Sequence, residues 1–299
     1  DVQAGHVLLS LYKEWKRRDE ILMQIVARSC HSLERDKTII EGIPRLTQFL
    51  VSKFDDPNRG FYKEITEKLF LRLLKNFDLA YLWSGVSEKT LRELKQRGLP
   101  SFQECINTYQ GTAKLILDDA YRRLGLTPQH PITDQRIQTE KTTRQLADFL
   151  FCPSTEVKKS FQAAGIPEQK LILTSYGWST QRLSATLSAE KVPSEQLTFL
   201  FMGSACVRKG IHLLLRVWEK ADVKWKLIIF GKIEPVIREV FGELLARPDV
   251  IHRGFSKNYT EAYQEADVFV FPTLEEGSPL VVYEAMAHGL PIITSPMGA

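Results

Sequence analysis

The stretch from Thr273 to Met297, TLEEGSPLVVYEAMAHGLPIITSPM, decides the fold of this chain. An apolar run at 267–271 precedes it and another at 292–294 lies near its end, and both runs predict strands. Between them, residues 279–288 predict a short helix that is apolar on nearly every face. A strand, a helix and a second strand at this spacing are typical of a parallel α/β sheet.

The ends of this helix are marked in the sequence. Ser278 is expected to be its N-cap and Pro279 its first helical residue, while Gly289 supplies the left-handed stop. Glu284 is the only acidic residue inside the helix, and a carboxylate on a buried helix is costly unless a polar group meets it. Glu276 is a second carboxylate, in the loop just before the helix.

These two glutamates suggest a ligand site. Eight positions of helical rise separate them by at most ~12 Å, so they can hold the two ends of one polyhydroxylated ligand. The backbone N–H groups of Gly277, Ser278 and Leu280, around Pro279 at the positive end of the helix dipole, suit a phosphate. The alternative is that the spacing arises by chance.

A second constellation is FLFMGSACVRKG at 199–210, which predicts a strand, a turn at Gly203 and a basic pair before a helix. Loops that follow strands of a parallel sheet lie at its ligand-binding edge, so Arg208 and Lys209 can bring cations to a phosphate. A surface basic pair without a ligand is the alternative interpretation.

The block at 273–297 closely resembles the E-x7-E signature of the family-4 (group 1) retaining glycosyltransferases of GT-B fold, and the block at 199–210 resembles the strand, glycine, short loop and lysine-glycine of the same family. The resemblance covers residues 197–297 well and the rest of the chain loosely. It implies two Rossmann-like parallel-sheet domains facing across a cleft. It also implies that a sugar passes from a nucleotide-diphospho-sugar to an acceptor with retention of configuration, without a metal or another cofactor.

The resemblance also implies residue roles. Glu276 would hold hydroxyls of the donor sugar, Glu284 those of the ribose, and Lys209, with Arg208, the diphosphate. Phe255 follows a predicted strand and would lie at the base, although a core aromatic is an equal alternative. Relatives often carry an arginine directly after the glycine, where this chain has Ser204, and Arg208 is a candidate substitute.

The acceptor side is less specific. Many relatives place a histidine after the strand predicted at 101–106, and this chain has Asn107 there. Glu104 and Asn107 are the candidate acceptor contacts. The acceptor itself, whether a glycan, a lipid-linked or a small molecule, is not encoded in a recognisable motif.

Alternating strands and helices organise the rest of the chain. They predict an acceptor-side domain at 1–178, a hinge at 179–196 and a donor-binding domain at 197–299, with the chain incomplete at both ends. Residues 5–18 predict a helix ending in three basic residues. It is either a solvated surface helix or a peripheral contact with an anionic membrane.

Composition narrows the function classes. The 299 residues carry a net charge of +4 with 43% hydrophobic residues, as in ordinary globular proteins, and do not call for a nucleic-acid partner. The four widely spaced cysteines indicate buried free thiols in a reducing cytosol. Neither a dinucleotide-binding G-x-G-x-x-G nor a P-loop follows any predicted strand. The rival hypotheses are a non-catalytic nucleotide-sugar-binding protein and a GT-B-shaped epimerase or phosphorylase.

Overall fold

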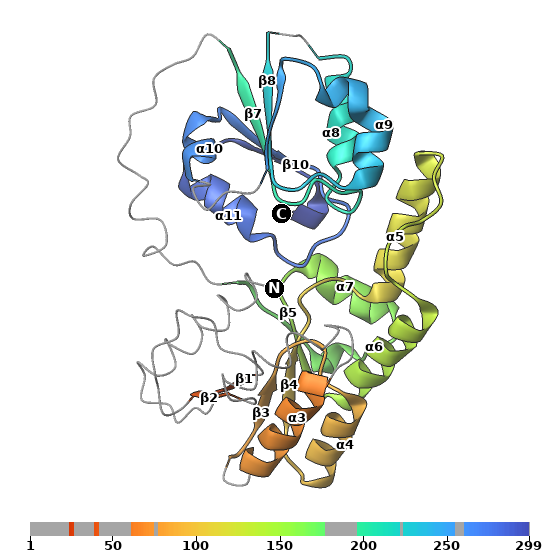
Figure 1. Cartoon of the computed structure of the whole chain (residues 1–299). Coiled ribbons are helices and arrows are strands. Elements are labelled where there is room, and N and C mark those ends of the chain that lie inside the picture. The colour runs from red at the N-terminus through yellow and green to blue at the C-terminus, as the bar shows by residue number, and fades with distance from the viewer. Residues whose placement is uncertain are drawn as a thin grey trace. The chain divides into compact units, whose positions relative to one another are not determined.

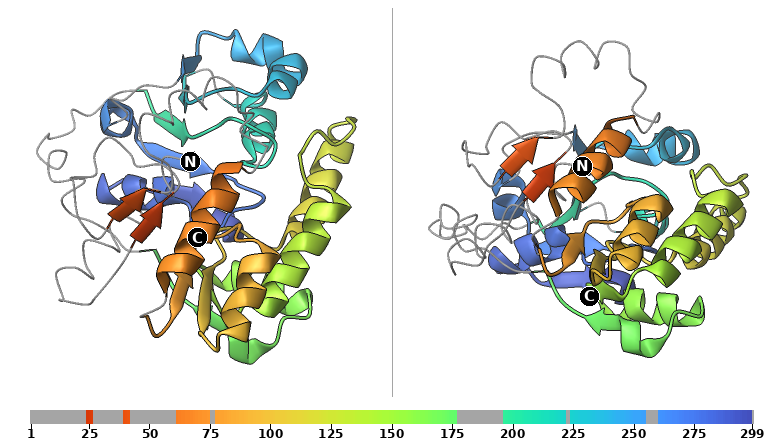
Figure 2. Two further views of the ribbon diagram at one scale, coloured as in Figure 1. Left: turned by 60° about the horizontal axis from the view of Figure 1, so that its bottom comes forward. Right: turned by 90° about the horizontal axis from the view of Figure 1, so that it is seen from below.

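The computed structural model describes residues 24–26, 39–41, 61–74, 77–176, 196–221, 224–254 and 260–298. The chain divides into two compact units. The first comprises Asp1–Gln103 and Thr142–Phe149, and the second Glu104–Lys141 and Leu150–Ala299. Strands β1 (Gln24–Val26) and β2 (Ile39–Glu41) form a small parallel pair that Figure 2 shows side by side.

A four-stranded sheet has the order β3-β4-β5-β6, with β3 parallel to β4 and β5 parallel to β6. Ser87 and Ser154 are the N-caps of two of its helices, α4 and α7, because each hydroxyl accepts a backbone N–H of the first turn. The strands are Ala80–Leu82, Ser101–Glu104, Phe149–Cys152 and Leu171–Leu173. The helices are α3 (Phe61–Leu73), α4 (Glu88–Gln96), α5 (Gln110–Arg123), α6 (Asp134–Leu146) and α7 (Thr155–Ala163), and a 3-10 turn at Glu168–Lys170 precedes β6.

A five-stranded sheet lies wholly in the second unit, in the order β11-β10-β7-β8-β9 with every pair parallel. Helices α8 and α9 cover one face and α10 and α11 the other (Figure 1). The strands are β7 (Thr198–Met202), β8 (Lys226–Phe230), β9 (Val250–Gly254), β10 (Val268–Phe271) and β11 (Ile292–Thr294). The helices are α8 (Ile211–Trp218), α9 (Pro235–Leu245), α10 (Thr260–Glu265) and α11 (Leu280–Ala287), and a 3-10 turn follows at Pro296–Gly298.

The core of this sheet explains its sequence pattern. Its central strands are buried on both faces, so they read as continuous apolar runs rather than as an alternation, and Leu200, Phe201 and Ile228 are fully buried there. The strand order reverses between β7 and β10. In parallel sheets a ligand binds at the carboxyl ends of the strands at such a reversal. The predicted class, α/β with parallel sheets, is confirmed.

One predicted helix boundary is wrong. The N-cap of α11 is Pro279, and the hydroxyl of Ser278 instead contacts the hydroxyl of Tyr283 at 3.1 Å. Helix α11 therefore begins at Leu280 rather than at Pro279. Its end agrees with the prediction, because Gly289 follows the last turn with a φ of 70°.

Other predictions fall on residues that are not described: the basic helix at 5–18, nearly all of the hinge at 179–196, and Phe255. Among the described cysteines, Cys105 and Cys152 are buried free thiols, whereas Cys206 is only partly buried. No helix in the described part of the chain is both long and apolar enough to span a membrane.

Candidate active site

The loop that follows β7 is shaped by close backbone contacts. Gly203 adopts a φ of 122° and donates its N–H to the carbonyl of Phe230 at 2.9 Å. A Cβ on Gly231 would lie 2.2 Å from the carbonyl oxygen of Gly203, so both turns need glycine. Likewise a Cβ on Gly210 would lie 1.8 Å from the carbonyl oxygen of Pro272. The β7 loop is thus packed directly against the end of β10.

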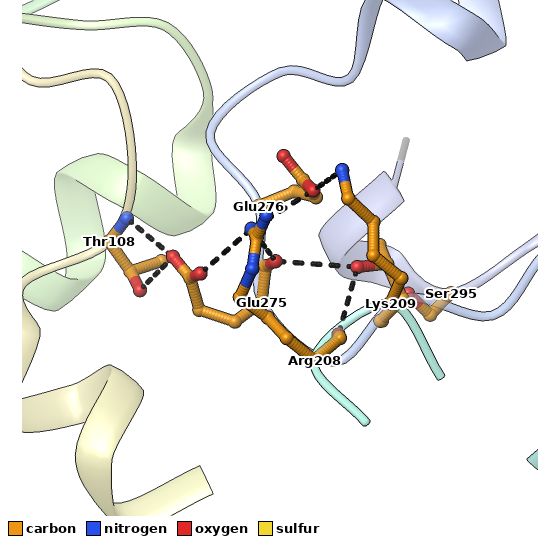
Figure 3. Close-up of polar contacts among 7 residues, drawn as sticks. Thr108, Arg208, Lys209, Glu275, Glu276 and Ser295 are labelled. Carbon is orange, nitrogen blue, oxygen red and sulfur yellow. Dashed lines mark hydrogen bonds and ion pairs between the residues drawn. The ribbon is translucent and has the colours of Figure 1, made fainter. Parts of the chain in front are cut away.

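This packing brings the predicted cations to Glu276 (Figure 3). Arg208 donates from Nη1 to Oε1 of Glu276 at 3.0 Å, and Nζ of Lys209 forms an ion pair with the same oxygen. Nζ of Lys209 also lies 5.2 Å from the ring centre of Phe271, a cation–π distance. Three residues chosen from the sequence as catalytic candidates therefore form one cluster at the reversal of the strand order.

Glu275 is a member of this cluster that the sequence did not reveal. Its side chain is 3% exposed, and Oε2 lies 3.3 Å from Nη1 of Arg208. Oε1 accepts hydrogen bonds from Thr108, at 3.1 Å from the backbone N–H and 2.8 Å from the hydroxyl (Figure 3). Burial disfavours the charged guanidinium, but the carboxylates of Glu276 and Glu275 outweigh it and raise the pKa of Arg208. Arg208 is therefore held as a cation.

The candidate acceptor residues lie on the segment that ends in Thr108. Asn107 is exposed, whereas Glu104 is buried. A Cβ on Gly277 would lie 1.8 Å from the carbonyl oxygen of Ile106 and 3.3 Å from the backbone nitrogen of Asn107. The loop before α11 thus touches the backbone next to Asn107, and both segments belong to the second unit.

Tyr176 is a further neighbour that no motif singled out. Burial raises the pKa of its hydroxyl, and the nearby Glu104, Cys105 and Glu276 raise it further. The phenol is therefore a neutral hydrogen-bonding group within electrostatic reach of Glu104, from the predicted acceptor side, and Glu276, from the predicted donor side.

Glu284, the second glutamate of the signature, has different surroundings. It is 7% exposed and accepts a hydrogen bond from the hydroxyl of Tyr263 at 3.0 Å. The ring of Tyr263 stacks on His288 with 4.7 Å between centres, and Nδ1 of His288 lies 2.7 Å from the carbonyl of Glu284. The buried carboxylate thus has the polar partner that its burial requires.

Residues 196–299 match the family model described as Glycosyl transferases group 1. They are a group 1 glycosyltransferase domain. An uncharacterized glycosyltransferase of Methanocaldococcus jannaschii is 27% identical over 173 residues, which cover 51% of this chain and 44% of that protein. The sulfoquinovosyl transferase of Arabidopsis thaliana is 26% identical over 161 residues, 51% of this chain and 31% of that protein. These matches span less than half of either relative.

Solved structures extend the likeness beyond the group 1 domain. WaaG, a glycosyltransferase of lipopolysaccharide biosynthesis, superimposes with a TM-score of 0.59 at 15% identity, covering 89% of this chain and 71% of that one. Anabaena HepE in complex with UDP-glucose gives a TM-score of 0.55 at 12% identity, covering 87% and 72%. At such identities the likeness establishes the shared fold.

Proposed function

We propose that this chain carries the donor-binding and acceptor-side residues of a retaining glycosyltransferase, which moves a sugar from a nucleotide-diphospho-sugar to a glycan, lipid-linked or small-molecule acceptor. The observation that supports it best is the cluster of Arg208, Lys209 and Glu276, where the loops after β7 and β10 meet. The group 1 domain and the solved relative that holds UDP-glucose support the same donor class.

The two cations have a defined task in this proposal. Negative charge grows on the diphosphate as the glycosidic bond breaks, and cations already in place stabilise that charge best. In the structure Glu276 binds both Arg208 and Lys209. We infer that the diphosphate takes over these cations and that Glu276 then turns to the hydroxyls of the donor sugar. With two cations at the diphosphate, the reaction needs no metal.

Glu284 has the second donor role. Its buried carboxylate, held by Tyr263, is proposed to accept the ribose hydroxyls of the nucleotide. Glu104 and Asn107 are proposed to face the acceptor, with the Tyr176 hydroxyl beside them as an added hydrogen-bonding group.

The first experiment measures which nucleoside diphosphate raises the melting temperature of the chain. A ligand at a hundred times its Kd stabilises the native state by about 2.7 kcal/mol, which is several degrees. Lys209→Met should weaken that binding about 10- to 100-fold, because a hydrogen bond to a charged group contributes about 1.5–3 kcal/mol. Lys220→Met, an exposed lysine beyond the far end of α8, should leave it unchanged.

Measuring the products of turnover distinguishes a glycosyltransferase from an epimerase and from a non-catalytic binding protein. A glycosyltransferase releases free nucleotide from the matching nucleotide-sugar with retained configuration in the product. An isomerised donor would instead indicate an epimerase. Tight nucleotide binding without release from any donor, in the presence of glycan and lipid acceptors, would indicate a non-catalytic binding protein and overturn the proposal.

A further inference from the structure

Glu275 joins two segments that lie 167 positions apart in the chain. One oxygen of its carboxylate accepts both hydrogen bonds of Thr108, and the other faces Arg208. Burying a carboxylate costs free energy unless hydrogen bonds and an opposite charge compensate, and here both are present. Nη1 of Arg208 also donates to the backbone carbonyl of Glu275 at 3.0 Å, so side chain and backbone hold the same guanidinium.

The backbone around this contact is equally constrained. The N–H of Leu274 donates to the carbonyl of Arg208 at 2.9 Å, and the hydroxyl of Thr273 lies 3.3 Å from the carbonyls of both Arg208 and Glu275. The segment 273–275 is thus bonded to the backbone of Arg208 as well as to its side chain. A change at Glu275 therefore acts directly on the position of that cation.

On its other side Glu275 acts at the start of α5. That helix has no acidic residue in its first turn and no side-chain cap from its own N-cap residue, Tyr109. Instead, the N–H of Tyr109 donates to the hydroxyl of Ser160 at 2.9 Å, and the N–H of Gln110 donates to the carboxylate of Glu140 at 2.7 Å. The carboxylate of Glu275 accepts the N–H of Thr108. Glu275 and Glu140, both distant in the sequence, thus supply the negative charge that a helix N-terminus favours.

We propose that Glu275 is a positioning residue. It holds Arg208 in place for the donor diphosphate, and it holds the acceptor-side segment 106–108 at a fixed position relative to Arg208. The proposal rests on the proposed function, because it takes the cluster as the diphosphate site. It makes the affinity for the nucleotide depend on Thr108, a residue that does not itself contact the cations in the structure.

Two substitutions test the two contacts of Glu275 separately, the one with Arg208 and the one with Thr108. In Glu275→Gln the amide oxygen still accepts from Thr108, but the amide N–H₂ then faces the Arg208 guanidinium, donor against donor. Thr108→Val removes one of the two hydrogen bonds to Glu275 and keeps the shape of the side chain. Glu140→Gln is the matched control, because Glu140 also caps the start of α5 and has no described contact with Arg208.

The experiment measures UDP affinity by calorimetry, with GDP or ADP instead if one of these is the nucleotide that stabilises the wild type. We expect Glu275→Gln to lower the affinity about tenfold, Thr108→Val about threefold, and Glu140→Gln less than twofold. The double variant should bind like Glu275→Gln alone, because residues that act through one contact are not additive. Removal of a negative charge would by itself favour an anion, so unchanged or tighter binding by Glu275→Gln overturns the proposal. Additive effects in the double variant also overturn it.

Hydrogen exchange at the Thr108 amide supplies a readout that needs no ligand. Exchange should remain slow in Glu275→Gln and become at least tenfold faster in Glu275→Ala, and unchanged exchange in Glu275→Ala contradicts the contact between Glu275 and Thr108. If none of the three nucleotides binds the wild type, the proposed function fails for these donors while the exchange result still decides whether Glu275 holds the segment 106–108.

Discussion

Gly277→Ala tests the contact between the loop before α11 and the segment 106–108. The new Cβ would lie 1.8 Å from the carbonyl oxygen of Ile106, whereas real Cβ contacts stay above 3.0 Å, so the two backbones must separate by roughly 1.2 Å. A separation of that size would stretch the 2.8 Å hydrogen bond between Thr108 and Glu275 beyond bonding distance. Overpacking of this kind costs about 1–3 kcal/mol. We expect a loss near the upper end, because backbone rather than a flexible side chain must move.

The measurement is thermal unfolding together with nucleotide affinity. About 3 kcal/mol corresponds to a decrease in Tm of roughly 6–12 °C for a unit of about 200 residues. Gly242→Ala in α9 is the matched control, since its Cβ would meet nothing within 4 Å. We expect that variant to be neutral or slightly stabilised, because alanine is the better helix former. If Gly277→Ala unfolds at the wild-type temperature and binds nucleotide normally, the close contact with Ile106 is wrong.

Three further outcomes follow from individual side chains. Burial lowers the pKa of His212 from its ordinary 6.5 to about 4, so the unfolded chain binds a proton in that range that the native chain does not. The stabilisation is complete above pH 6.5 and is lost, up to about 3 kcal/mol, as pH falls to 4. His212→Gln should flatten the dependence of Tm on pH in this window, and parallel curves would contradict this reasoning. Ser278→Ala should cost less than about 0.5 kcal/mol in denaturant unfolding, against about 1 kcal/mol for the true N-cap variant Ser154→Ala, and equal losses would count against the cap assignment. Glu284→Gln should keep the hydrogen bond from Tyr263 and the wild-type Tm while weakening nucleotide binding at least tenfold, and unchanged affinity by calorimetry would remove Glu284 from the donor site.

The fold was predictable because its signals are local. Apolar runs, glycine stops and serine caps such as Ser87 and Ser154 act within a few residues, so the sequence alone locates helix and strand ends. Ser278 shows the limit of this reasoning. Serine is a residue type that N-caps favour, but the hydroxyl of Ser278 contacts Tyr283 instead of a backbone N–H of the helix. The N-cap residue is Pro279.

The candidate site was only half predictable. Glu276, Lys209 and Arg208 stand in motifs with recognisable spacing, and the structure brings all three into contact. Glu275 differs because its role is set by Thr108, and no sequence pattern links residues so far apart. The one local signal was the pair of adjacent acids at 275–276, which reads as an ordinary acidic loop until the burial of both carboxylates is known.

The start of α5 has a consequence for the order in which the chain acquires its structure during synthesis. The partner for the N–H of Gln110 is made 30 residues later, but the partner for the N–H of Thr108 is made 167 residues later. At about 5–20 residues per second, the ribosome needs roughly 8–33 s to produce Glu275 after Thr108. During that interval the nascent segment before α5 lacks its carboxylate, so we expect the segment 106–108 to reach its final position only after the loop before α11 has been synthesised.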